Sequence, residues 1–187
     1  MVEAHAVPGP ARERVLEAAE RVVAEVGAAR LTLDVVAQAA GVSKGGLLYH
    51  FPSKESLLGA LAQRYVQTME HCIEDAKVRI SDQDQSRDLK ACIVGILGSD
   101  PRSKAMGAAL LATAANDLTL LEVIRERLAA YNQELVASSA DFARAAIVTL
   151  AIDGLMMRES LRISPFTEAE RERVVRELMK IADESYR

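Results

Sequence analysis

The chain has 187 residues, of which 50% are hydrophobic and 27% are charged, a balance typical of a globular protein. No run of about 18 apolar residues occurs, so the sequence predicts no membrane-spanning helix. The net charge of −4 at pH 7 argues against a protein that coats nucleic acid non-specifically, but it does not exclude a small, local DNA-binding face.

The cysteines and the first residues indicate the compartment. The chain has two cysteines, Cys72 and Cys92, and its start lacks the basic and then apolar regions of a signal peptide. We therefore expect a reduced, cytoplasmic protein in which both cysteines are small core residues, with a redox role for either left open. The three histidines, His5, His50 and His71, are not spaced as metal ligands, and no motif indicates a cofactor.

Helical periodicity dominates the chain. Residues 1–8 are predicted to form a disordered arm. A first helix is predicted over 11–26, because apolar residues recur there at every third or fourth position, and Gly27 is a suitable C-cap. Hydroxyl residues mark the next three helix starts, since each can accept a hydrogen bond from a first-turn N–H: Thr32 before 33–40, Ser43 before a helix ending near Phe51, and Ser53 before a long helix reaching about Ile80.

Five further helices are predicted near 86–98, 102–115, 118–137, 140–161 and 167–184. The fold class is therefore all-α, with three short helices, a long connecting helix and a larger helical body. We assign residues 9–69 to an N-terminal domain and residues 70–187 to a C-terminal one.

Residues 32–51 have the spacing of a helix-turn-helix. Ala37 offers a small side chain where the two helices cross, Gly41 can adopt a left-handed conformation in the turn, and Leu47 fills the space between the helices. The same spacing also occurs in helical hairpins that do not bind DNA, so the flanking residues decide the interpretation.

Those flanking residues favour DNA binding. The second helix of such a unit enters the major groove by its N-terminal end, which here begins with Ser43 and Lys44. Tyr49, His50 and Lys54 follow, and no acidic residue interrupts this stretch. Their hydroxyl, imidazole and ammonium groups are good phosphate donors.

The stretch "TLDVVAQAAGVSKGGLLYHFPSKESLL" resembles the DNA-binding signature of the TetR (tetracycline repressor) family of transcriptional regulators, and "RERVLEAAERVVAEVGAARLT" resembles the family's first helix. The resemblance covers about residues 9–69 and is carried by Thr32, Ala37, Gly41-Val42-Ser43, Gly45, His50-Phe51 and Ser53-Lys54-Glu55. It implies a homodimeric regulator, expected to be a repressor, that binds an inverted-repeat operator in double-stranded DNA. A small molecule bound among the central helices would shift the fourth helix and release the DNA.

The resemblance also implies the DNA contacts, position by position: Thr32, Ser43, Lys44, Gly45, Gly46, Tyr49, His50 and Lys54. The first and last of these would bind phosphates. Lys44 is the candidate for a base edge, because lysine can donate to guanine O6 and N7. Gly45 permits close backbone approach, whereas Gly46 and Leu48 depart from the family's usual residues and remove possible polar contacts to DNA.

The C-terminal body is the expected site of effector binding and dimerisation. Candidate pocket residues are Met69, Met106, Leu110, Thr113, Asn116, Tyr131 and Met157, although methionines at helical spacing are more often ordinary core. The helix near 140–161 is apolar almost all round and must therefore be buried, either between subunits or in a self-contained core. Candidate interface residues are Ile147, Leu150, Gly154, Val174, Leu178 and Ile181.

Two other classes of function were weighed against a DNA-binding regulator. An enzyme is not expected, because the sequence has no Gly-x-Ser-x-Gly motif, no Gly-rich phosphate loop and no suggestive pair of carboxylates. A helical interaction module that has lost specific DNA binding is the remaining alternative, and Gly46 and Leu48 favour it slightly.

Overall fold

The computed structural model describes residues 10–27, 30–114 and 141–183, together with six single positions between 122 and 135. Regular structure among these residues is helical throughout, which confirms the all-α prediction. The helices are α1 (Ala11–Val26), α2 (Leu33–Ala40), α3 (Lys44–His50), α4 (Lys54–Lys77), α5 (Arg87–Leu97), α6 (Pro101–Ala114), α8 (Phe142–Ser160) and α9 (Glu168–Ala182). The helix predicted near 118–137 falls mostly outside the described residues.

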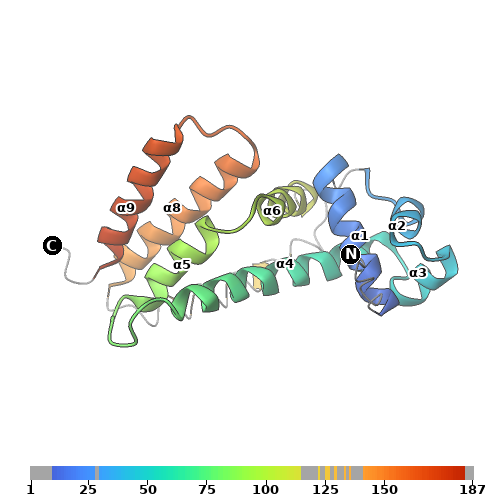
Figure 1. Ribbon diagram of the computed structural model, residues 1–187, viewed down its shortest axis with the longest axis horizontal. Helices are drawn as coiled ribbons and strands as arrows, with labels where there is room; N and C mark the ends of the chain where they lie inside the picture. Colours follow the sequence, from blue (N-terminus) through green and yellow to red (C-terminus); the bar gives the residue numbers. More distant parts are fainter. Residues whose placement is uncertain are drawn as a thin grey trace, which may run out of the picture.

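The helices divide between two ends of an elongated molecule (Figure 1). Helices α1, α2 and α3 gather at one end, and α5, α8 and α9 form the body at the other. Helix α4 runs along the molecule from the first group to the second, and its 24 residues correspond to about 36 Å of helix. Helix α6 lies between the two groups, beside α4.

The three predicted N-caps are confirmed. The hydroxyl oxygens of Thr32, Ser43 and Ser53 accept hydrogen bonds from backbone N–H groups three residues later, at 3.2, 3.1 and 3.1 Å. Each of these caps satisfies an amide that the helix itself leaves without a partner. The long helix α4 ends at Lys77, three residues before the predicted Ile80, because the chain turns there.

Two large hydrophobic cores, and a small one of Ile73, Ala76 and Ala91 between α4 and α5, hold the described part of the molecule together. The first unites α1 to α4 around Val15, Leu31, Leu47 and Phe51, and it also takes in Met106 and Leu110 of α6. The second joins α5, α8 and α9 around Ile93, Val148, Ile152 and Leu178. Helix α6 follows α5 in the chain, yet its buried side chains complete the N-terminal core, so it ties the two ends of the molecule together.

Helix α5 lies very close to α4. A Cβ atom added at Gly95 would stand 2.7 Å from the Cys72 carbonyl oxygen, so only glycine fits at this crossing. Cys92 is buried in the second core, as predicted, and Cys72 is partly buried. Neither takes part in a disulfide.

A cluster of charged groups fixes the start of α6 to the body. The Lys104 ammonium donates to the Leu97 carbonyl oxygen at 3.1 Å and to the Glu159 carboxylate at 2.8 Å. The Arg171 guanidinium from α9 donates to the same carboxylate and to the same carbonyl. The Ser160 hydroxyl donates to the Lys104 carbonyl oxygen at 3.0 Å. These bonds connect the end of α5 with α6, α8 and α9.

Candidate nucleic-acid interface

Helices α2 and α3 form the predicted helix-turn-helix. Gly41 has φ 64° and ψ 36°, the left-handed conformation expected of it, and the Val42 N–H donates to the Ala37 carbonyl oxygen at 3.1 Å. Leu47 is fully buried between the helices. The tight turn and the apolar contact fix α3 relative to α2, which is what a recognition helix requires.

The N-terminal end of α3 faces outward. Ser43, Lys44 and both glycines that follow are exposed, and Tyr49 is 84% exposed on the same helix. The Ser43 hydroxyl oxygen accepts within the helix, so its O–H remains available to donate outward. The Thr32 hydroxyl oxygen likewise accepts within α2, so its O–H is also available to donate. His50 is partly buried, and its ring meets the Tyr49 ring edge to face at 5.0 Å.

The two glycines of α3 differ in their surroundings. A Cβ at Gly45 would have no neighbour within 4 Å, so nothing in the protein's own packing requires glycine there. A Cβ at Gly46 would stand 3.2 Å from the Ser43 hydroxyl oxygen, the atom that caps the helix. The cap is therefore a structural reason for glycine at position 46, and the sequence alone did not reveal it.

Lys44 already has a partner within the protein. Its ammonium nitrogen lies 2.9 Å from one carboxylate oxygen of Asp34 on α2 and 3.2 Å from the other. This pair was not predicted from the sequence, because the two residues lie on different helices. Nor was the contact of Arg12, whose guanidinium stands 5.4 Å from the centre of the Phe51 ring. Phe51 itself is buried, as predicted.

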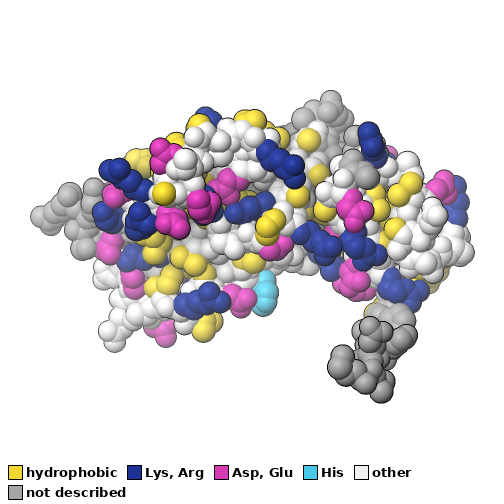
Figure 2. All heavy atoms as spheres, turned by 45° about the horizontal axis from the view of Figure 1, so that its top comes forward, with side chains coloured by type: hydrophobic (Ala, Val, Ile, Leu, Met, Phe, Trp, Pro, Cys, Tyr) yellow, Lys and Arg dark blue, Asp and Glu magenta, His cyan; other side chains and the backbone are white. Residues whose placement is uncertain are grey.

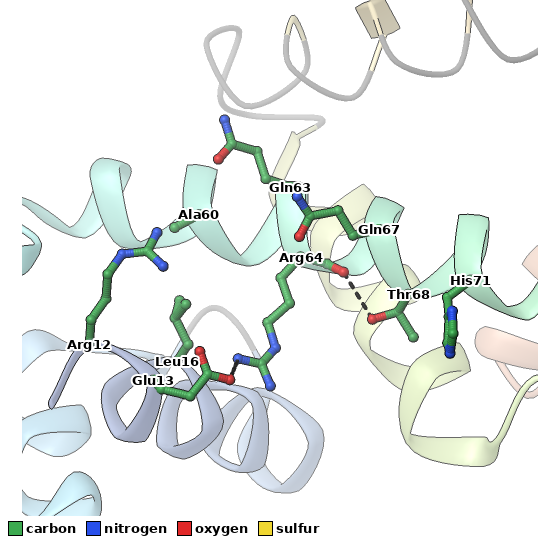
Figure 3. Close-up of a pocket in the computed structure, with 9 residues that line it drawn as sticks. All are labelled: Arg12, Glu13, Leu16, Ala60, Gln63, Arg64, Gln67, Thr68 and His71. Carbon is green, nitrogen blue, oxygen red and sulfur yellow. Dashed lines mark hydrogen bonds and ion pairs between the residues drawn. The ribbon is translucent and has the colours of Figure 1, made fainter. Parts of the chain in front are cut away.

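An ion-pair cluster connects this domain to α4. The Arg64 guanidinium reaches from α4 to Glu13 and Glu20 on α1, with 2.8 Å between its Nε and a Glu20 oxygen. Figure 3 shows Arg64 directed toward Glu13 in a groove of about 420 Å³ between α1 and α4. Burial raises the pKa of the Glu20 carboxyl, and the charge of Arg64 opposes that shift only in part.

Two further polar side chains lie on α4 and α8: Tyr65 is partly buried, and Asp153 is exposed. The Tyr65 hydroxyl rests against Gly107 of α6, where an added Cβ would stand 2.5 Å from the phenol oxygen. Burial and the negative charge of Asp153 on α8 raise the pKa of Tyr65. Desolvation raises the pKa of the Asp153 carboxyl. Among the residues that the structure describes, Asp153 has no ion pair.

The predicted pocket residues are not all brought together. Met69 is buried on α4, whereas Met106 and Leu110 pack in the N-terminal core, and Met106 also borders a small cavity beside Tyr65. Met157 is 50% exposed on α8. Asn116, Tyr131 and the side chain of Thr113 lie outside the described part of the chain, so the pocket stays a prediction.

The predicted interface residues fall into two groups. Ile147 and Leu150 are 55% and 71% exposed, and together with Gly154, Met157 and Leu161 they form one stripe along α8. Figure 2 shows apolar side chains at the surface of the C-terminal body, among charged ones. The residues expected on α9, by contrast, pack against α8 of their own chain: Leu178 is buried, and Val174 and Ile181 are partly buried in the second core.

No helix within the described ranges has both the length and the hydropathy needed to cross a membrane. Nor does the described part of the chain hold a group of three or more His, Cys, Asp or Glu side chains arranged for a metal ion.

Two family models match the sequence. Residues 15–61 match the one described as bacterial regulatory proteins, tetR family. Residues 87–183 match the one described as tetracyclin repressor-like, C-terminal domain. Together the two matches include the helix-turn-helix and all of α5, α6, α8 and α9.

Similar proteins include named regulators. The transcriptional regulator BetI of Serratia proteamaculans is 30% identical over 173 residues, which cover 85% of this chain and 85% of BetI. The regulator TtgR of Pseudomonas putida is 34% identical over 86 residues, or 46% of this chain. That match spans 39% of TtgR, well under two thirds of its length.

Solved structures share the fold. A transcriptional regulator from Rhodococcus sp. Rha1 superposes with a TM-score of 0.78 at 23% identity, over 92% of this chain and 96% of that one. The multidrug binding protein EbrR, complexed with ethidium, has a TM-score of 0.65 at 25% identity, over 90% of this chain and 98% of that one.

Proposed function

The chain belongs to the TetR family of DNA-binding transcriptional regulators, and we propose that it is a homodimeric repressor that a small-molecule effector releases from its operator. The observation that carries the proposal is the helix-turn-helix itself, whose second helix is fixed by Gly41 and Leu47 and presents an exposed N-terminal end. Such a regulator acts where the DNA is, which in bacteria is the cytoplasm.

The proposed DNA contacts follow from exposure and chemistry: Ser43 and Thr32 are exposed, and Lys54, the first residue of α4, is partly exposed. Ser43, Thr32 and Lys54 donate to phosphates, and Lys44 donates to a guanine edge. Tyr49 supports this assignment, because an aromatic side chain that is 84% exposed at the end of a recognition helix has no role in the chain's own core.

The proposed dimer uses the stripe on α8. Five residues at helical spacing, Ile147, Leu150, Gly154, Met157 and Leu161, place apolar or small groups on one outward face. Water contact with this face is unfavourable, and pairing with the same face of a second copy removes it. The expected result of Leu150→Glu is a monomer in sedimentation velocity, whereas Glu172→Ala on the exposed side of α9 is the control that stays dimeric.

The proposed release depends on α6. Its N-terminal end is bonded to the body through Lys104 and Glu159, and its buried Met106 and Leu110 lie in the core of the DNA-binding domain. A shift of α6 in the body therefore moves apolar contacts of α1, and Arg64 couples α1 to α4 on the other side. These contacts support a path by which effector binding changes the spacing of the two recognition helices.

Ethidium, the ligand in one EbrR structure, is a suitable first probe for an effector. We expect the purified protein to bind it saturably and to release its operator when it is bound.

The decisive experiment is a selection from random-sequence duplexes with the purified full-length protein. Enrichment of an inverted repeat is expected, with binding that weakens steeply as salt is added. Lys44→Ala should reduce the discrimination between sequences, and Lys54→Ala should lower affinity for all of them alike. Enrichment of no sequence would refute a DNA-binding function and favour an interaction module.

A further inference from the structure

The Asp34–Lys44 pair lies at the point where sequence is read. Lys44 is the first residue of α3, and the Asp34 carboxylate that holds its ammonium belongs to the first turn of α2. Both side chains are well exposed, at 60% and 69%, so the pair faces solvent on the same surface as Ser43. The DNA would approach this surface in the proposed function, on which the following inference rests.

Asp34 places a negative charge beside the proposed DNA contacts. It is the only acidic residue between Leu31 and Lys54, the stretch that supplies both helices and their turn. A carboxylate beside DNA phosphates is repelled, which lowers affinity for every sequence. A carboxylate in the first turn of α2 stabilises the helix dipole, but the dipole does not require the contact that Asp34 makes with Lys44 on the next helix.

We propose that Asp34 is a specificity-determining residue, which positions Lys44 for a guanine edge and keeps it from binding phosphates indiscriminately. A lysine ammonium is a compact charge that pairs with any phosphate within reach. When Asp34 holds the Lys44 ammonium, its charge is neutralised and its position is fixed. Contact with an arbitrary phosphate then adds little binding free energy.

A guanine edge differs from a phosphate in the number of acceptors. The ammonium has three N–H donors, and guanine offers O6 and N7 side by side in the major groove. Lys44 can therefore keep one hydrogen bond to Asp34 and give the other two to the base. Asp34 thus acts through Lys44, as a positioning residue.

The test is a double-mutant cycle in the full-length protein, measured by fluorescence anisotropy with the selected operator and a scrambled duplex of the same composition. We expect Asp34→Asn to tighten binding to the scrambled duplex by about fivefold, the size of an exposed ion pair. Because Lys44 would then neutralise one more phosphate, the slope of log affinity against log salt should steepen by about 0.9 on that duplex. Operator affinity should change less, so discrimination falls.

The same Asp34→Asn change in a Lys44→Ala background is the matched control. If Asp34 acts through Lys44, the change in salt slope disappears in the Lys44→Ala background. In the wild-type background, Asp34→Glu should keep part of the discrimination that Asp34→Asn loses. An equal change of slope in both backgrounds would mean simple charge repulsion and would overturn the proposal. So would unchanged discrimination in Asp34→Asn. A wild type that prefers no duplex would instead refute the proposed function itself.

Discussion

The glycine pair in α3 supports a prediction in which stability and DNA affinity move in opposite directions. Gly45 is the second residue of a seven-residue helix, and an added Cβ there has no neighbour within 4 Å. Gly45→Ala removes the conformational freedom of glycine in the unfolded chain at no steric cost, and it should raise the free energy of unfolding by about 0.5–1 kcal/mol. For a chain of this size that corresponds to a rise in Tm of about 1–4 °C.

The same methyl group should weaken operator binding. It projects from the exposed end of α3, where the backbone is expected to approach the groove, so it would displace the helix from the DNA. A loss of about tenfold or more in affinity is expected, of the order of one lost interface contact. The assays are thermal unfolding followed by far-ultraviolet circular dichroism, at one fixed protomer concentration, and anisotropy with the selected operator.

Gly46→Ala is the matched control. Its Cβ would stand 3.2 Å from the capping Ser43 oxygen. The stabilisation expected from replacing glycine with alanine in a helix is therefore offset by disturbance of the cap. It should therefore stabilise less than Gly45→Ala does. If Gly45→Ala stabilises the protein and binds the operator as well as wild type, the close-approach explanation of Gly45 is wrong.

Three further changes test the fold. Ser43→Ala removes the α3 cap and should lower the free energy of unfolding by about 1 kcal/mol, measured by urea titration. Gly95→Ala forces a Cβ to within 2.7 Å of the Cys72 carbonyl oxygen. It should lower the free energy of unfolding by about 1–3 kcal/mol or more, whereas Gly45→Ala should raise it. Glu159→Gln should cost about 1–3 kcal/mol at pH 7, reduced from the fully buried case because the side chain is 15% exposed. Burial alone would raise the pKa of Glu159, but its two cationic partners outweigh burial and lower it, so this stabilisation is present above the unfolded pKa and is lost as pH falls through the folded one. The gap between wild type and Glu159→Gln should accordingly shrink in urea titrations below about pH 4.

Features set by neighbouring residues could be predicted from the sequence. The Ser43 cap depends on a hydroxyl and an N–H three positions apart, and the turn depends on Gly41 alone. Both are determined within one turn of chain, so tertiary packing does not have to be known. The bounds of α1 and α2 follow from the same local signals and agree with the prediction, whereas α4 ends three residues before its predicted end.

Features set by the crossing of helices could not be predicted. Asp34 and Lys44 are ten residues apart on different helices, and their contact depends on the angle between α2 and α3. Leu178 belongs to an apolar stripe in either case, and only the position of α8 shows that its own chain already covers it. Periodicity identifies a face to be buried, but it does not identify the partner that buries it.

A net charge of −4 and a DNA-binding face are compatible because the two act over different distances. At physiological salt, charges more than about 8 Å apart are largely screened, so the acids of the C-terminal body contribute little at the groove. In the proposed function the DNA meets the stretch from Leu31 to Lys54, which has two lysines and one acid, and that acid pairs with Lys44. With both glycines and Leu48 offering no polar contact, few side chains remain to read bases. Selectivity must then come from how well Lys44 is directed and from the shape of the groove, rather than from the number of contacts.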